Sequence, residues 1–149
     1  MKKTLMNSII IYIIVSGIMG TYLYVFGDSE VYKNLSIITR IKYDIQGLIV
    51  SFLYTIISIK LPQIISKDIK FVAIGSFIIS IVFSIIIMKG NWVWIFSSLC
   101  TIGAWIKGFG IYSIWMKKYK NPMLYTLIIM TISEVIIFIY DLIFYTVII

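Results

Sequence analysis

The chain has 149 residues, of which 61% are hydrophobic and 13% are charged, with a formal net charge of +7 and a mean hydropathy of +1.05. This composition excludes a water-soluble globular domain, because too little polar surface is available to cover so much apolar side chain. Histidine is absent and Cys100 is the single cysteine, which excludes disulfide frameworks, zinc sites and histidine-based acid–base chemistry.

The first apolar segment runs from Thr4 to Gly27 and follows Lys2 and Lys3. It is too long for the apolar core of a typical signal peptide and lacks a small-residue cleavage site. We therefore interpret it as a retained transmembrane helix over roughly residues 5–26, long enough for a hydrocarbon layer of ~30 Å. The polar stretch after it, roughly 27–43, is predicted to be an external loop at the membrane interface.

A second helix is predicted over roughly 43–61. Pro62 is expected to end this helix or to open the next turn, because proline disrupts a helix interior. A short basic loop then leads to Lys70, and a third helix is predicted over roughly 71–88.

The fourth predicted helix, roughly 92–115, has a tryptophan at each end. Trp92 and Trp115 would thus lie where an aromatic belt meets the membrane interface. A fifth helix is predicted over roughly 122–147, and Pro122 is suited to its first turn. Together the five segments predict a single all-α integral membrane domain over 1–149, a bundle of five transmembrane helices.

Lysine and arginine are unevenly divided between the two sides of this bundle, and cytoplasmic loops keep the excess. With the N-terminus inside, the inner side holds eight basic residues: Lys2, Lys3, Lys60, Lys67, Lys70, Lys117, Lys118 and Lys120. The outer side holds four: Lys33, Arg40, Lys42 and Lys89. We therefore expect a cell-membrane protein in contact with the lipid bilayer, with a cytoplasmic N-terminus and an external C-terminus. Because the basic residues follow this topogenic pattern, nucleic-acid binding is not expected.

Two ionisable residues fall deep within the predicted helices, Lys107 in the fourth and Glu134 in the fifth. Such residues are expensive in lipid and indicate a functional site. Counted from the intervening loop they reach nearly the same depth, so an ion pair between them is geometrically possible. They could form a gate, a proton-coupled switch or a ligand anchor. Alternatively, they only hold two helices together, or Lys107 extends its ammonium to the inner surface.

Asp141 lies seven residues after Glu134, on the same predicted helical face. This face is expected to point towards a bundle cavity or a partner subunit. Two carboxylates on one helix need further oxygen ligands to hold a divalent ion, and no phosphate-binding loop or activated serine is present. We therefore predict a protein that is not an enzyme and that has neither a metal site nor a cofactor.

Small residues spaced by four allow two membrane helices to approach closely. Such pairs occur at Ser16 and Gly20 in the first predicted helix and at Ala104 and Gly108 in the fourth. Close helix packing is therefore expected at both places.

The segment GLIVSFLYTIIS carries Gly47, a Leu-Tyr pair ending at Tyr54, and then the small residue Ser58. A Val-Tyr pair ending at Tyr32 stands in the first loop. With five helices in ~150 residues and one long loop after the first helix, this layout resembles the translocator protein / tryptophan-rich sensory protein family, TspO. The similarity in segment lengths covers nearly the whole chain.

The family's helix-2 tryptophan falls at Val50, and the Pro-Tyr and Trp elements of its last helix are absent from this sequence. Only Tyr32, Gly47 and Tyr54 carry over by position. The resemblance implies a ligand cavity beneath the first loop for a hydrophobic molecule, tetrapyrrole-like or sterol-like, and often a homodimer.

Two functions remain open. In the first, the protein binds or senses a hydrophobic small molecule within its bundle. The candidate ligand-binding residues are Tyr32, Gly47, Tyr54, Lys107, Glu134 and Asp141. In the second, it is a small transport or permease accessory, or an immunity-type membrane subunit, that uses Lys107, Glu134 and Asp141 for ion coupling or docking. Its neighbour would then be a second copy or a partner membrane subunit.

Overall fold

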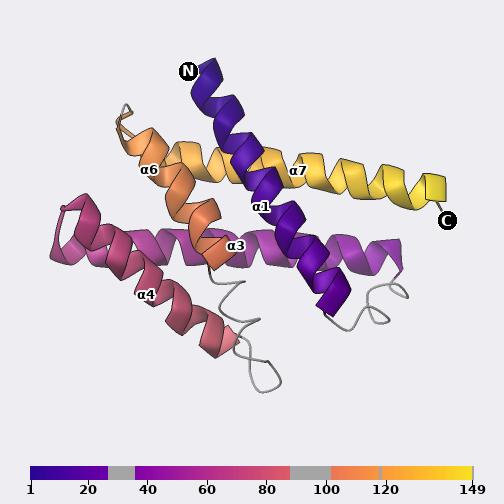
Figure 1. Cartoon of the computed structure of the whole chain (residues 1–149), viewed down its shortest axis with the longest axis horizontal. Helices are drawn as coiled ribbons and strands as arrows, with labels where there is room; N and C mark the ends of the chain where they lie inside the picture. The colour runs from indigo at the N-terminus through magenta and orange to yellow at the C-terminus, as the bar shows by residue number, and fades with distance from the viewer. Residues whose placement is uncertain (27–35, 88–101, 118, 149) are drawn as a thin grey trace.

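The computed structural model describes residues 1–26, 36–87, 102–117 and 119–148, and these ranges form helices and no strand (Figure 1). The elements are α1 (Lys2–Phe26), α3 (Ile37–Ile65), α4 (Ile69–Ile87), the π-helix η1 (Ile106–Gly110), α6 (Ile111–Met116) and α7 (Pro122–Ile148). Residues 102–105 are also helical and lead directly into η1. The chain is thus all-α over its described part.

Two predicted boundaries agree closely with the structure. Helix α4 lies within two residues of the predicted 71–88, and α7 begins at Pro122 as the sequence indicates. Proline suits this position because the first helical residues have no intrahelical partner for their N–H groups. Helix α1 begins at Lys2, three residues before the predicted start, and ends at Phe26.

The predicted boundary between the first loop and the second helix is wrong, because α3 begins at Ile37 instead of near residue 43. Ser36 caps the helix, since its Oγ accepts a hydrogen bond of 3.3 Å from the N–H of Thr39. The charged residues that suggested a loop are compatible with this early start. Lys42, for example, is exposed on the helix surface.

Of the two alternatives for Pro62, a helix end is wrong, because the proline lies inside α3 and opens its last turn, which continues to Ile65. The carbonyl of Pro62 accepts a hydrogen bond of 3.0 Å from the N–H of Ser66, so the last turn is closed after the proline. The ring lies against α4, because a Cβ at Gly75 would come within 2.8 Å of the Pro62 side chain. Packing on a neighbouring helix makes an internal proline tolerable.

Part of the predicted fourth helix, and the turn before it, lies outside the described residues. From residue 102 to Met116 the chain is helical as expected, but Ile106–Gly110 forms a π-helix that the sequence analysis did not predict. Trp115 is buried instead of lying at an aromatic belt, with 1% of its surface exposed. Its Nε1 donates to Ser8 Oγ (3.1 Å), and its ring stacks on Tyr125 at 4.7 Å between centroids.

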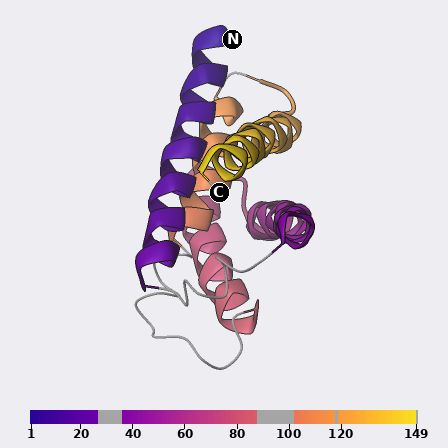
Figure 2. The ribbon, with the colours of Figure 1, turned by 90° about the vertical axis from the view of Figure 1, so that its right-hand side faces the viewer.

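The helices cross instead of running in one direction. Helices α3 and α7 lie side by side and antiparallel, α1 and α6 run at an angle to α7, and α4 runs at an angle to α3 on the side away from α7 (Figures 1 and 2). Helix α4 folds back against α3, and α6 contacts both α1 and α7. Three segments that are far apart in the sequence therefore meet where α1, η1–α6 and α7 cross.

The surface of the described part is apolar, with many large aliphatic side chains exposed on α1, α3, α4 and α7. The buried polar side chains there, apart from tyrosine, are serines and threonines: Ser8, Thr55, Ser58, Ser76, Ser80, Thr126 and Ser133. Extensive exposed apolar surface marks a membrane or protein contact. Hydroxyl side chains between helices are typical of membrane proteins.

Three of the described helices contain stretches that are long and apolar enough to cross a membrane: Lys2–Thr21, Ile45–Ile65 and Pro122–Ile143. Helix α4 adds a shorter apolar stretch, Ile69–Phe83. These lengths match the ~20 residues that a hydrocarbon layer requires of a helix. The described part of the chain is therefore all-helical with three candidate membrane spans, and this composition indicates a membrane location.

Candidate functional site

Tyr12 lies between the two ionisable residues that the sequence analysis singled out. Its hydroxyl donates a hydrogen bond of 2.5 Å to Glu134 Oε1. The Lys107 ammonium lies 5.0 Å from the centre of the Tyr12 ring, within the range of a cation–π contact. Lys107 Nζ also donates to Ser16 Oγ at 3.3 Å. The two ionisable residues that could form an ion pair therefore both contact Tyr12.

Helix α1 supplies the middle of this site from a single face. Ser8, Tyr12 and Ser16 are spaced by four residues, so their side chains project in nearly the same direction. Each contacts a different partner: Ser8 accepts from Trp115, Tyr12 binds Glu134, and Ser16 accepts from Lys107. This polar stripe fixes α1 against both η1–α6 and α7.

The π-helix positions Lys107, which is its second residue. A π-helical turn contains one more residue than an α-turn and often occurs at a functional site. Gly108, the next residue of the π-helix, allows α3 to approach closely. A Cβ at Gly108 would meet Thr55 Oγ1 at 2.9 Å, so any larger residue there would collide with α3.

The Tyr12 side chain is fully buried in a cluster that excludes water from one side of the site. Its neighbours in the cluster are Ile111, Trp115, Ile129 and Met130, and each has at most 2% of its surface exposed. Electrostatic contacts are stronger in such surroundings than in water. The Tyr12–Glu134 hydrogen bond is therefore both shielded and geometrically fixed.

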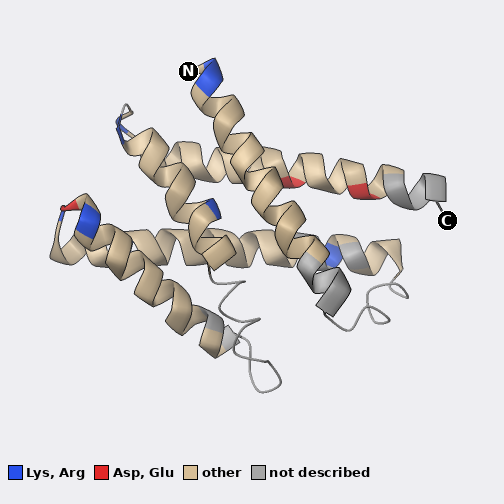
Figure 3. Ribbon diagram, in the orientation of Figure 1, with Lys and Arg blue, Asp and Glu red and all other residues tan. Residues whose placement is uncertain are grey.

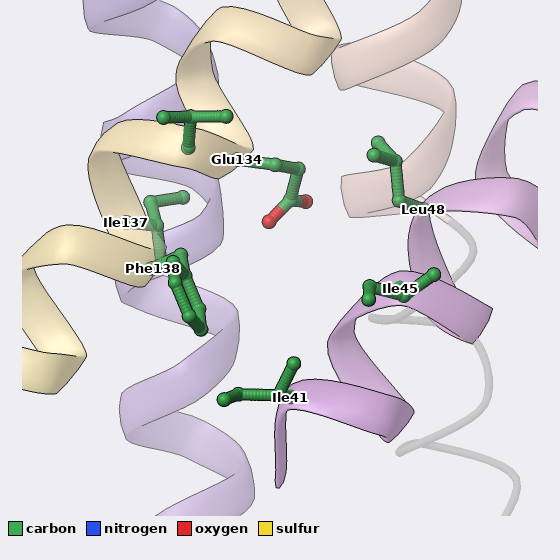
Figure 4. A pocket seen from close by; sticks show the side chains of 7 residues that line it. Ile41, Ile45, Leu48, Glu134, Ile137 and Phe138 are labelled. Carbon is green, nitrogen blue, oxygen red and sulfur yellow. The ribbon is translucent and has the colours of Figure 1, made fainter. Parts of the chain in front are cut away.

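Glu134 also borders a cavity of about 210 Å³ between α3 and α7 (Figure 4). From α3 the cavity is lined by Ile41, Ile45 and Leu48, which are spaced to share one helical face. From α7 it is lined by Glu134, Val135, Ile137 and Phe138. Every lining residue except Glu134 is apolar, and the close-up shows the Glu134 carboxylate projecting towards the space between the two helices.

No protein-family model, curated protein or solved structure matches this chain. The chemistry of the site must accordingly be argued from its own residues. Charged residues gather mostly near helix ends, whereas α7 carries acidic residues along its length (Figure 3). Among the described residues there is no group of three or more Asp, Glu or Cys side chains placed to hold a metal ion.

The other predicted site residues lie apart from the Tyr12 contacts. Tyr54 is buried between α3 and α4, where its hydroxyl hydrogen-bonds to Ser80 and its ring meets Phe83 edge-on at 6.0 Å. Gly47 is exposed on α3, and a Cβ there would have no neighbour within 4 Å. Asp141 is partly buried on α7, two turns beyond Glu134, and Tyr32 lies outside the described residues.

Sequence reasoning missed Tyr12 and Ser16, as well as the α3 wall of the cavity. The polar spacing on α1 could have pointed to the first two, because a serine, a tyrosine and a serine recur every four residues in an otherwise apolar helix. The α3 wall was assigned partly to a loop, since its helix was predicted to begin near residue 43. The early start of α3 at Ile37 brings Ile41 opposite Phe138.

The arrangement gives Glu134 two chemical environments. One oxygen accepts the Tyr12 hydroxyl, and the carboxylate also borders the apolar cavity. A carboxylate has about four lone-pair positions, so one hydrogen bond leaves most of its accepting capacity unused by Tyr12. The site can therefore hold a polar or charged group of a ligand at Glu134 while the cavity walls cover an apolar body.

Proposed function

We propose that the chain crosses the cell membrane five times, with a cytoplasmic N-terminus and an external C-terminus. Three long apolar helices support a membrane location, and α4 and the apolar segment that ends at Met116 supply the other two crossings. The excess of basic residues on the inner side sets the direction. C-terminal fusions test the external C-terminus, and fusions after residues 67, 89 and 117 test the number of crossings. Alkaline phosphatase should be active after residue 89 and at the C-terminus and inactive after residues 67 and 117, and green fluorescent protein should give the reverse pattern. Any other alternation would overturn this topology.

We further propose that the protein binds a hydrophobic small molecule in the cavity between α3 and α7. The observation that carries this proposal is the cavity itself, whose walls are aliphatic and aromatic apart from one carboxylate. Ligand sites have this composition, with few polar groups among many apolar ones. Binding at such a site needs no catalytic group, so the proposed protein is a binding protein and not an enzyme.

The volume of the cavity bears on the size of the ligand. At about 210 Å³ it exceeds the ~150 Å³ apolar cavity that holds benzene but is smaller than the ~300–1,000 Å³ pockets that enclose drug-sized molecules. A tetrapyrrole or a sterol, which the resemblance to TspO implies, would extend far beyond it. The cavity is open at one side, where Ile45 and Val135 are exposed, so its volume gives the size of the part of the ligand that it holds: one ring or a short branched chain.

Saturable binding of two small phenyl compounds to the protein in lipid nanodiscs tests this function. The probes are benzyltrimethylammonium and neopentylbenzene, which have the same shape, and empty nanodiscs correct for partition into lipid. Leu48→Trp should abolish binding of both because the larger ring fills the cavity. Ile49→Trp is the matched control, since Ile49 is exposed and does not line the cavity. The absence of saturable binding by either probe would overturn the proposed function.

A second candidate function is ion coupling or docking in a transport or immunity-type membrane assembly. It is favoured by the buried chain of contacts from Lys107 through Tyr12 to Glu134, which begins in a π-helix. In liposomes that enclose a pH-sensitive dye, this function predicts a proton flux that Glu134→Gln abolishes. Cross-linking in the native membrane would show whether the neighbour is a second copy or another subunit. A monomer that carries no proton flux would contradict this candidate function.

A further inference from the structure

The most unusual feature of the cavity is the carboxylate in its wall. Glu134 is partly buried, and the other residues that line the cavity with it are Ile, Leu, Val and Phe. A charged group next to apolar surface is unfavourable unless a partner of suitable chemistry compensates it. The nature of that partner should therefore identify the class of ligand.

Tyr12 provides only part of this compensation. Its hydroxyl donates one hydrogen bond to Oε1, and a neutral donor does not cancel the charge of a carboxylate. The Lys107 ammonium does not reach into the cavity lining; it lies over the Tyr12 ring and donates to Ser16. On the cavity side, the Glu134 carboxylate is therefore the polar group that a ligand would meet.

Three ligand classes can be compared by their chemistry. An anion would be repelled by the carboxylate. A neutral hydrocarbon would cover the carboxylate without offering it a hydrogen bond, which is unfavourable. A cation with an apolar body would neutralise the carboxylate and also fill the space between Ile41, Ile45 and Phe138, and its attraction to Glu134 would be strengthened by the apolar surroundings.

We infer that the ligand is a small hydrophobic monocation, an organic ammonium whose charged nitrogen lies at Glu134 and whose ring or short alkyl chain occupies the cavity between α3 and α7. This inference rests on the proposed function, because it names the ligand class of the same cavity. Phe138 adds an aromatic side chain to the wall, and aromatic groups also attract ammonium ions.

The two probes of equal shape provide the test, because benzyltrimethylammonium carries a permanent charge and neopentylbenzene carries none. Wild-type protein in nanodiscs should bind the cation at least about tenfold more tightly than the neutral compound. Glu134→Gln should remove this preference and leave the affinity for neopentylbenzene unchanged, which also shows that the variant is folded. Asp68→Asn is the control, because Asp68 is exposed between α3 and α4 and does not line the cavity.

The outcomes separate this inference from the function on which it rests. Equal affinity for the two probes in wild-type protein, or a preference that survives in Glu134→Gln, would overturn the inference while the proposed function stands. Loss of the preference in Asp68→Asn as well as in Glu134→Gln would show that the preference does not depend on Glu134 specifically, and would also overturn the inference. Failure of both probes to bind would remove the proposed function and the inference together.

Discussion

The Tyr12 hydroxyl and the Glu134 carboxylate, 122 residues apart in the chain, are joined by a hydrogen bond of 2.5 Å between α1 and α7. The same tyrosine ring lies beneath the Lys107 ammonium. One side chain of the first helix thus links the two ionisable residues of the later helices. The stability of variants at Tyr12, Lys107 and Glu134 should therefore depend on these contacts.

Replacing Tyr12 with Phe should lower the free energy of unfolding by about 1 kcal/mol, because it removes the hydroxyl but keeps the ring beneath Lys107. Unfolding by sodium dodecyl sulfate in mixed micelles, followed by circular dichroism, measures the change. Tyr125→Phe is the control, since its ring contact with Trp115 is retained. Equal effects of the two substitutions would contradict a specific role for the Tyr12 hydroxyl.

Exchanging the charges of Lys107 and Glu134 should not restore stability. Lys107→Glu would place a carboxylate over the face of the Tyr12 ring, which carries negative partial charge and repels anions. We expect each single change to lower the free energy of unfolding and the double change to recover little of the loss. A double-mutant cycle measures the recovery, and full rescue would indicate direct contact between the two residues.

Gly108→Ala should destabilise the protein by about 1–3 kcal/mol, because the new Cβ would lie 2.9 Å from Thr55 Oγ1. Adding Thr55→Ala should recover part of this loss, since only the Cβ at 3.5 Å would remain. Gly47→Ala, where a Cβ meets nothing within 4 Å, is the control and should stabilise the helix by about 0.5–1 kcal/mol. Equal changes in the free energy of unfolding for Gly108→Ala and Gly47→Ala would rule out the close approach of α3 to η1.

Ser133→Ala should raise the free energy of unfolding by about 1 kcal/mol. Its hydroxyl is fully buried and has no hydrogen-bond partner among the described residues, so alanine removes an unsatisfied polar group. Ser76→Ala should have the opposite effect, because the Ser76 hydroxyl accepts a hydrogen bond of 2.9 Å from Trp105 Nε1. A lower free energy of unfolding in both variants would contradict an unsatisfied hydroxyl at Ser133.

Local chemistry made several elements predictable. Pro122 and the uninterrupted apolar run after it indicated the last helix, and the structure begins α7 at that proline. The small residues at Ala104 and Gly108 indicated close packing, and Gly108 does lie against Thr55. The first predicted pair is different, because a Cβ at Gly20 would have no neighbour within 4 Å. Spacing therefore identifies faces that allow close approach, but it does not identify which of them are used.

Errors arose where a local preference was outweighed by packing or capping. Charged residues after Ser36 suggested a loop, yet the Ser36 cap and the apolar face of α3 produce a helix from Ile37. Pro62 suggested a helix end, yet its ring fits against Gly75 of α4 and the helix continues. The propensities of the charged residues and of Pro62 do not include these two contacts, the cap at Ser36 and the packing against Gly75.

The sequence by itself determined that the chain is helical, apolar and able to cross a membrane, because these properties follow from composition and from the length of each apolar run. It also predicted that Lys107 and Glu134 reach nearly the same depth. Only the tertiary structure decided that Tyr12 lies between them and that Ile41 faces Phe138 across a cavity. Periodicity gives the face of one helix, whereas the partner of that face depends on how the helices cross.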